Sequence, residues 1–260
     1  MARVIAVAGK GGTGKTTFCG MAVKYLVDKG MQPVLAIDAD ANLNLNEVLG
    51  VEIKQTIGDV RNDLLKNMGM LPAGMDKDTW IELKLQDSMV ETKYFDLVAM
   101  GKPEGTGCYC YVNSVLQRYM EILEKNYPYV IMDNEAGLEH ISRGTTRNVS
   151  YLLIVSDASP RGVRTAARIR DLVIDLELKV GGMGAILSRM SEPEMTNMAM
   201  AEAQKRELDI VGVIPADANI VRFDMADRSL MGLPADSPAL LAVGAVMDKI
   251  LEGAEATVAL

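Results

Sequence analysis

Short apolar runs rich in β-branched residues alternate with amphipathic stretches along the whole chain. Most runs are continuously apolar, which is typical of parallel strands covered on both faces. Strands that alternate with helices form βαβ units, so the pattern predicts an α/β fold: a doubly wound, mostly parallel sheet with helices on both faces. Strands are expected at residues 3–7, 34–38, 95–100, 129–133, 151–156, 184–187 and 210–214, and helices at 16–29, 111–126, 161–176, 194–207 and 238–251.

No linker-like composition and no repeat interrupts this pattern, so residues 1–260 are expected to form one domain. Residues 50–94 are the least regular part and contain the only tryptophan, Trp80. We interpret this region as helices inserted at the rim of the sheet, with or without a function of their own.

Composition and charge limit the classes of partner. The formal net charge of −8 argues against binding to nucleic-acid phosphates, which requires a basic face. No apolar run approaches the roughly 18–20 residues of a membrane span. Three cysteines exclude a disulfide scaffold and fit a reducing compartment. We therefore expect a cytoplasmic protein that binds neither nucleic acid nor membrane.

Residues 9–16 read GKGGTGKT and match G-x-x-x-x-G-K-[ST] between an apolar strand and an amphipathic helix. Glycines let the backbone N–H groups surround a phosphate, and the helix N-terminus adds partial positive charge. Lys15 is expected to reach the β- and γ-phosphates, and the Thr16 hydroxyl to bind Mg²⁺. The guanine-reading pattern N-K-x-D is absent, which favours ATP. The predicted nucleotide-binding residues of the loop are Gly11, Gly12, Thr13, Gly14, Lys15, Thr16 and Thr17.

Three aspartates occur where predicted strands end. The strand at 34–38 ends in Asp38 and is followed by Asp40, and the strand at 129–133 ends in Asp133 in a Walker B pattern. The carboxyl ends of parallel strands form the ligand edge of such a sheet. Each aspartate taken singly is also compatible with an ordinary turn, but the set together with the phosphate loop favours a Mg-nucleotide site.

Cys108 and Cys110 follow a stretch with several glycines and a proline, so we expect them on a loop at the same rim. In extended backbone, C-x-C places both sulfurs on one side. Two thiolates are too few for a closed four-ligand site, but two such pairs across a twofold axis would make one. Ordinary burial in the loop is the alternative. Cys19 is expected to pack within its helix. His140 is the only histidine, which almost excludes a histidine-based metal site or a Ser-His-Asp catalytic triad.

The additional lysine of the loop, Lys10, makes the motif resemble the deviant Walker A loop of the nitrogenase iron protein, MinD and ParA family. In that family this lysine crosses a twofold axis to the partner's phosphates, which implies a homodimer with Lys10 acting catalytically in trans. The resemblance also implies that Asp40 orients the attacking water and that Asp38 lies near the Mg²⁺ with Asp133. It further places Pro215 and Asp217 in a base-contacting loop and Ser188 where the family often has an adenine-binding asparagine.

Two further segments narrow the resemblance. Residues 101–110 read GKPEGTGCYC and residues 133–140 read DNEAGLEH, and with the phosphate loop they look like the CooC-type ATPases. Those proteins mature the nickel sites of carbon monoxide dehydrogenase or acetyl-CoA synthase. The resemblance implies a Mg-dependent ATPase and metallochaperone that uses ATP and dimerises around a Ni²⁺ or Zn²⁺ ion held by Cys108 and Cys110. No cysteine follows Cys110, which argues against the electron transfer of the nitrogenase iron protein.

Three alternatives stay open. A MinD-like membrane-positioning ATPase would need a basic amphipathic C-terminal helix, but residues 247–255 are acidic and short. A ParA-like DNA-partition ATPase would need a basic surface. A non-catalytic, nucleotide-gated assembly scaffold has the same motifs as an ATPase, and only turnover separates the two.

Overall fold

The computed structural model describes residues 2–67, 75–101, 121–123, 125–135 and 149–258. The strands of this part of the chain form one eight-stranded sheet in the order β3-β4-β2-β5-β1-β6-β7-β8. All neighbours pair in parallel except β3 with β4. The strands are β1 (Arg3–Gly9), β2 (Val34–Ala39), β3 (Val90–Glu91), β4 (Phe95–Ala99), β5 (Tyr129–Asn134), β6 (Tyr151–Ser156), β7 (Met183–Met190) and β8 (Ile210–Pro215).

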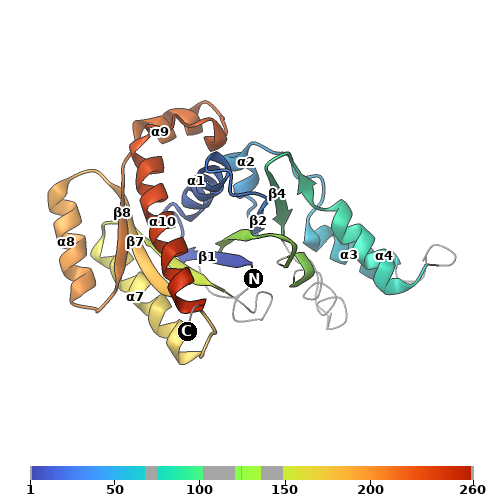
Figure 1. Cartoon of the computed structure of the whole chain (residues 1–260), viewed down its shortest axis with the longest axis horizontal. Helices are drawn as coiled ribbons and strands as arrows, with labels where there is room; N and C mark the ends of the chain where they lie inside the picture. The colour runs from blue at the N-terminus through green and yellow to red at the C-terminus, as the bar shows by residue number, and fades with distance from the viewer. Residues whose placement is uncertain (1, 68–74, 102–120, 124, 136–148, 259–260) are drawn as a thin grey trace.

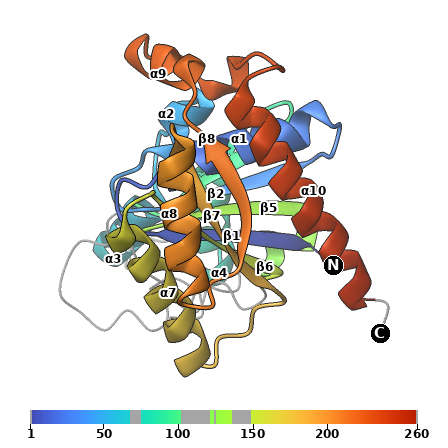
Figure 2. The ribbon, with the colours of Figure 1, turned by 90° about the vertical axis from the view of Figure 1, so that its left-hand side faces the viewer.

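Helices cover both faces of the sheet (Figure 1), because both faces of its strands are apolar. On β1, Val4 and Ala6 pack on one side while Ile5 and Val7 pack on the other. The first side carries α3 (Ile57–Asn67), α4 (Lys77–Asp87), α7 (Pro160–Asp175) and α8 (Pro193–Gln204). The second side carries α1 (Lys15–Asp28), α2 (Leu45–Leu49), α9 (Ala218–Met225), the 3₁₀ turn η1 (Leu230–Gly232) and α10 (Pro238–Val258). Figure 2 shows α7 and α10 on opposite sides of β7 and β8.

The predicted fold class is confirmed, with differences of detail. The two-residue strand β3 and the short helices α2 and α9 are additions to the predicted elements, since none is long enough to show a period in the sequence. Strand β7 continues through Ser188 and Arg189 to Met190, and α10 continues to Val258. The expected helix at 111–126 lies largely outside the described residues.

Residues 50–94 do contain helices, but they pack on the sheet and are not only a solvated rim. Ile57 and Val60 of α3, and Ile81 and Leu85 of α4, are buried in the core on the first side of the sheet. Burial of these four side chains accounts for the position of both helices.

The strand order places a crevice at the carboxyl end of β1. The neighbours of β1 are β5 on one side and β6 on the other, while the chain that leaves β1 crosses through α1 to β2. Such reversals of strand order are where open α/β sheets bind ligands. None of the helices in the described part of the chain has both the length and the apolar character of a membrane span.

Candidate functional site: a phosphate loop and its aspartates

The phosphate loop connects β1 to α1 by a closed turn. Gly12 (φ 75°) and Gly14 (φ 93°) have left-handed backbone, which glycine adopts without a Cβ penalty. Thr13 lies between them, fully buried, and its N–H and hydroxyl donate to the Lys10 carbonyl at 3.3 and 2.9 Å. The loop therefore leads directly into the N-terminus of α1, where unpaired N–H groups favour an anion.

The first glycine of the motif is required by the sheet. Gly9 has a φ of 149° and pairs in register with Val155 of β6. A Cβ at this position would lie 2.3 Å from the Val155 carbonyl oxygen, far closer than van der Waals contact allows. Strands β1 and β6 can approach each other this closely only with glycine at position 9.

A cavity of about 790 Å³ opens above the loop at the carboxyl edge of the sheet. Its floor is the phosphate loop and the start of α1, with Lys15, Thr16 and Thr17 among the lining residues. Lys15 is buried, with 7% of its surface exposed, so its charge is held inside the cavity. Lys10 is half-buried and does not line this cavity. The walls come from the segment after β2, the ends of β7 and β8, and α9.

Asp133 is a buried acid at the end of β5 beside the loop. It is 1% exposed, and neither carboxylate oxygen makes a well-formed hydrogen bond with a described residue. Burial raises its pKa to about 7; Thr16 and Lys15 act to lower the value, and Asp38 and Asp40 to raise it. A buried carboxylate without partners, next to a threonine hydroxyl, is a donor set suited to a hard divalent cation such as Mg²⁺. Mg²⁺ completes its shell with water and phosphate oxygens, so one carboxylate and one hydroxyl from the chain are sufficient.

Asp38 is the register partner of Asp133 on the adjacent strand β2. It is fully buried, and its two oxygens accept the backbone N–H groups of Asp40 and Leu45, both at 3.0 Å. Burial raises the pKa of Asp38, against the effect of these hydrogen bonds. Asp38 therefore holds the start of the following loop and α2 in place, and its charge faces Asp133.

Asp40 lines the cavity and is half-buried. One of its carboxylate oxygens accepts the backbone N–H of Asn42 at 2.9 Å, which orients the side chain. Its other oxygen has no hydrogen bond to a described residue and so can hold a water molecule. The structure thus brings Lys15, Thr16, Asp38, Asp40 and Asp133 close to one another at this edge of the sheet.

The nature of this site agrees with the sequence profile that the chain matches. The profile of the CobQ/CobB/MinD/ParA nucleotide binding domain covers residues 4–230, from β1 to η1. The chain belongs to the CobQ/CobB/MinD/ParA family.

Relatives of this family match almost the whole chain. An ATP-binding protein of Methanocaldococcus jannaschii is 40% identical over 250 residues, which are 95% of this chain and 98% of the relative. The carbon monoxide dehydrogenase accessory protein CooC of Rhodospirillum rubrum is 32% identical over 240 residues, 88% of this chain and 89% of the relative. Among solved structures, MinD of Pyrococcus horikoshii in complex with Mg-ADP superposes with a TM-score of 0.71 at 20% identity, covering 99% of both chains. MinD of Aquifex aeolicus gives 0.70 at 23% identity over 96% of this chain and 97% of that one.

The loop after β8 lines the same cavity, with both Pro215 and Asp217 at its wall. The Asp217 carboxylate is already occupied, because it accepts Asn219 N–H at 2.8 Å, Ser237 Oγ–H at 2.5 Å and Ala239 N–H at 3.1 Å. Burial opposes ionisation of Asp217, but these hydrogen bonds hold its pKa below the usual range. Asp217 therefore ties the start of α9 to the start of α10 while it lines the cavity.

Of the three cysteines, Cys19 lies within the residues that the structure describes. Cys19 is fully buried in α1, consistent with packing, and burial raises the pKa of its thiol well above the usual value, with Asp133 and Asp38 adding to the effect. Cys108, Cys110 and His140 lie outside the described residues. Within the described ranges, no group of three or more His, Cys, Asp or Glu side chains is arranged to hold a metal ion.

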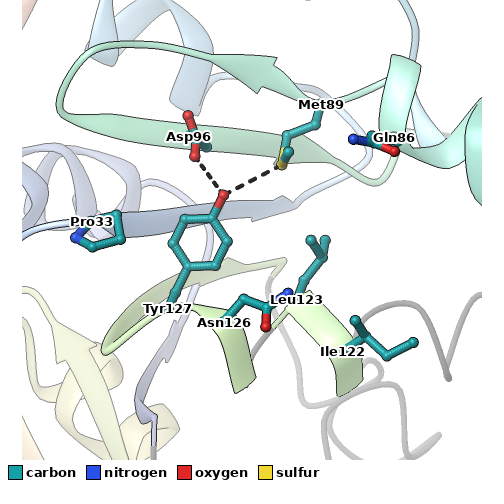
Figure 3. Close-up of a pocket in the computed structure, with 8 residues that line it drawn as sticks. All are labelled: Pro33, Gln86, Met89, Asp96, Ile122, Leu123, Asn126 and Tyr127. Carbon is teal, nitrogen blue, oxygen red and sulfur yellow. Dashed lines mark hydrogen bonds between the residues drawn. The ribbon is translucent and has the colours of Figure 1, made fainter.

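A second cavity of about 420 Å³ lies near the amino ends of β2, β4 and β5, whereas the phosphate loop follows the carboxyl end of β1. Figure 3 shows the side chains that line this cavity. Its main polar feature is the Tyr127 hydroxyl, which donates to Asp96 Oδ2 at 2.5 Å and lies 3.7 Å from the sulfur of Met89. None of the residues that line it is a cation, so it is not suited to a nucleotide phosphate.

Sequence reasoning missed Arg189 and did not anticipate the contact that Ser188 makes. Both line the nucleotide cavity from the end of β7. Their position after a buried strand was the available signal, but the direction of two adjacent side chains cannot be read from a sequence.

Proposed function

We propose that this protein is a Mg²⁺-dependent ATPase that forms a homodimer around its nucleotides and acts as a metallochaperone for a nickel enzyme, either carbon monoxide dehydrogenase or acetyl-CoA synthase. The observation that carries the ATPase part is the complete phosphate loop at the floor of the cavity, with the buried carboxylate of Asp133, which makes no well-formed hydrogen bond, beside Lys15 and Thr16. The metallochaperone part is supported by similarity to CooC, a carbon monoxide dehydrogenase accessory protein, along 88% of this chain.

The residues of the cavity have separable roles in hydrolysis. Lys15 and the loop N–H groups would bind the phosphates, and Thr16 and the buried Asp133 beside it would hold a Mg²⁺ ion, which would supply positive charge to the phosphate oxygens. Asp40 orients the attacking water with its unengaged oxygen. Asp38, near the end of β2, accepts the backbone N–H of Asp40, and this hydrogen bond fixes the position of Asp40.

Lys10 is the group that we assign to the partner subunit's nucleotide. Its side chain stays outside the cavity of its own chain although it lies in the phosphate loop. A cation supplied from a second subunit stabilises the charge that develops on the transferred phosphoryl group, in the way that an arginine finger does. This arrangement makes ATP hydrolysis dependent on the dimer.

The proposed cargo site is built from cysteine thiolates of both subunits. Cys108 and Cys110 supply two thiolates in each chain, and two chains supply the four that Ni²⁺ or Zn²⁺ takes in a thiolate site. Hydrolysis would relax the loop held by Asp38 and release the ion to the client enzyme.

Metal stoichiometry tests the shared site. We expect one Ni²⁺ or Zn²⁺ per dimer, bound more weakly as the pH falls because thiolates must be deprotonated. Cys108→Ser or Cys110→Ser should abolish this binding, since a hydroxyl is a far less acidic ligand, and should leave ATP hydrolysis in place. Cys19→Ser is the matched control, because Cys19 is buried in α1. Metal analysis after gel filtration, with and without Mg-ATP, is the measurement. One metal per monomer, or full binding without both cysteines, would contradict the shared site.

Binding to membranes and DNA separates this proposal from MinD-like and ParA-like roles. The last turn of α10 carries no basic residue, and the net charge of the chain is −8. We therefore expect neither cosedimentation with anionic liposomes nor a shift of duplex DNA at physiological salt, with or without ATP. Binding to liposomes only in the presence of ATP would support the membrane-positioning alternative instead.

A further inference from the structure

Strand β7 ends in a bulge that faces the phosphate loop. Leu187 of β7 pairs with Val213 of β8, and Met190 pairs with Pro215. Ser188 and Arg189 therefore oppose the single residue Ile214, which is the two-against-one count of a β-bulge.

The bulge changes where two adjacent side chains point. In a regular strand, successive side chains point to opposite faces of the sheet. Here both reach the same loop: Ser188 Oγ donates to the Thr13 carbonyl and Arg189 Nη2 donates to the Gly12 carbonyl, each at 2.5 Å. Arg189 has a φ of 57°, a left-handed conformation that is uncommon for a residue other than glycine. Strained backbone of this kind persists where the surrounding structure holds it, and it is concentrated at functional sites.

The two hydrogen bonds fix two successive peptide planes. In a trans peptide the C=O and N–H groups point in opposite directions. With the Gly12 carbonyl turned to Arg189, the N–H of Thr13 faces the Lys10 carbonyl, to which it donates at 3.3 Å. With the Thr13 carbonyl turned to Ser188, the N–H of Gly14 points away from β7.

The contact between the loop and the bulge is close on both sides. Thr13 is fully buried and Ser188 is 6% exposed. A Cβ on Gly14 would lie 3.8 Å from Ser188 Oγ, which is ordinary van der Waals distance. Arg189 is exposed at the cavity, where its positive charge adds to that of Lys15.

We propose that Ser188 and Arg189 are positioning residues of the phosphate loop, which hold it in its phosphate-binding shape before nucleotide arrives. The first peptide plane closes the turn that carries Lys10, and the second directs the Gly14 N–H toward the phosphate site. Arg189 acts here through the Gly12 carbonyl, in the same chain, whereas Lys10 is assigned to the partner's nucleotide. This inference rests on the proposed use of ATP.

The hydrogen bonds from Ser188 and Arg189 should affect the affinity for a β-phosphate, because the loop surrounds the β- and γ-phosphates. Arg189→Ala is expected to weaken Mg-ADP and pyrophosphate binding about tenfold, the scale of one hydrogen bond to a charged group. AMP affinity should change less than about twofold. Arg189→Lys, which keeps a cation, should recover part of the loss. Arg168→Ala on α7 is the matched control, because Arg168 is exposed and does not line the cavity.

Binding titrations with AMP, ADP and pyrophosphate, alongside melting temperatures without ligand, measure these effects. A positioning role predicts a lower ADP-to-AMP affinity ratio at an unchanged melting temperature. Ser188→Ala should act in the same direction, and the two losses should be less than additive because both groups hold one loop. An equal loss for AMP and ADP would overturn the proposal and place Arg189 on the nucleoside, and unchanged ADP affinity would also overturn it.

The two proposals fail in different ways. Wild-type protein that binds ADP but does not hydrolyse ATP would remove the ATPase function and leave the ADP-to-AMP test of Arg189 valid. If the wild type bound no nucleotide, pyrophosphate binding and the amide NMR signal of Gly14 would still report on the loop. An unchanged Gly14 signal in Ser188→Ala would then overturn the positioning role, because Ser188 holds the peptide plane that carries this N–H.

Discussion

Replacement of Lys10 by alanine is expected to lower ATP turnover by about 10³-fold, the lower end of the range for a cation supplied in trans. ATP affinity should change less than about threefold, because Lys15 and the loop N–H groups remain in the cavity that Lys10 does not line. ATP-dependent dimerisation should be lost together with turnover. Steady-state hydrolysis, nucleotide titration and sedimentation measure the three effects.

Charge and position can be separated by two further variants. Lys10→Arg keeps a cation at the site and should retain more turnover than alanine. Lys54→Ala is the control for loss of one lysine, since Lys54 is exposed and does not line the cavity. Wild-type turnover in Lys10→Ala would remove the role in trans, and a large loss of ATP affinity would assign Lys10 to the nucleotide of its own chain.

Asp133→Asn is expected to reduce Mg-dependent hydrolysis by at least about 10²-fold while making the nucleotide-free protein more stable at alkaline pH. Asparagine cannot replace an anionic Mg²⁺ ligand, which explains the loss of activity. It also cannot ionise, which removes the cost of a buried, partnerless charge. Few other substitutions should separate activity from stability so clearly.

The pH dependence follows from the direction of the pKa shift. The pKa of Asp133 is about 7 in the folded protein and about 3.9 in an unfolded chain. Between these values the folded state binds the extra proton, so stability falls as the pH rises and levels off above pH 7. The variant and the wild type should therefore have similar stability near pH 4 and differ by about 4 kcal/mol at pH 8, which is about three pKa units at about 1.4 kcal/mol each.

Chemical denaturation from pH 4 to pH 9, without and with Mg-ADP, measures this difference. Mg-ADP should stabilise the wild type and release a proton from Asp133, and it should stabilise Asp133→Asn much less. Asp87→Asn controls for loss of an acid, because Asp87 is exposed at the end of α4. Equal stabilisation of both proteins by Mg-ADP would remove Asp133 from the metal site.

The parts of the site that the sequence predicted are those built from local pattern. The phosphate loop is contiguous, and Asp38 and Asp133 each end an apolar run, so their meeting at one edge follows from parallel strands. The sequence could not predict that the Asp38 carboxylate accepts the backbone N–H groups of Asp40 and Leu45, because these hydrogen bonds depend on the conformation of the loop after β2.

Features that depend on strand register were beyond the sequence. The inward turn of Arg189 arises from one extra residue in β7 relative to β8, and no residue in the segment marks a bulge. The hydrogen bond that the Asp217 carboxylate accepts from Ser237, twenty residues further along, could not be predicted either. Contacts between segments that are distant in sequence decide such roles.

Gly9 gives the phosphate-loop motif a second meaning. A motif search treats its first glycine as evidence for phosphate binding, whereas here that glycine is demanded by the carbonyl of Val155 in the neighbouring strand. A descendant that had lost nucleotide binding would still need glycine at this position to keep β1 and β6 together. The first glycine of the motif is therefore required by the packing of the sheet, and only the later residues of the motif are evidence for phosphate binding.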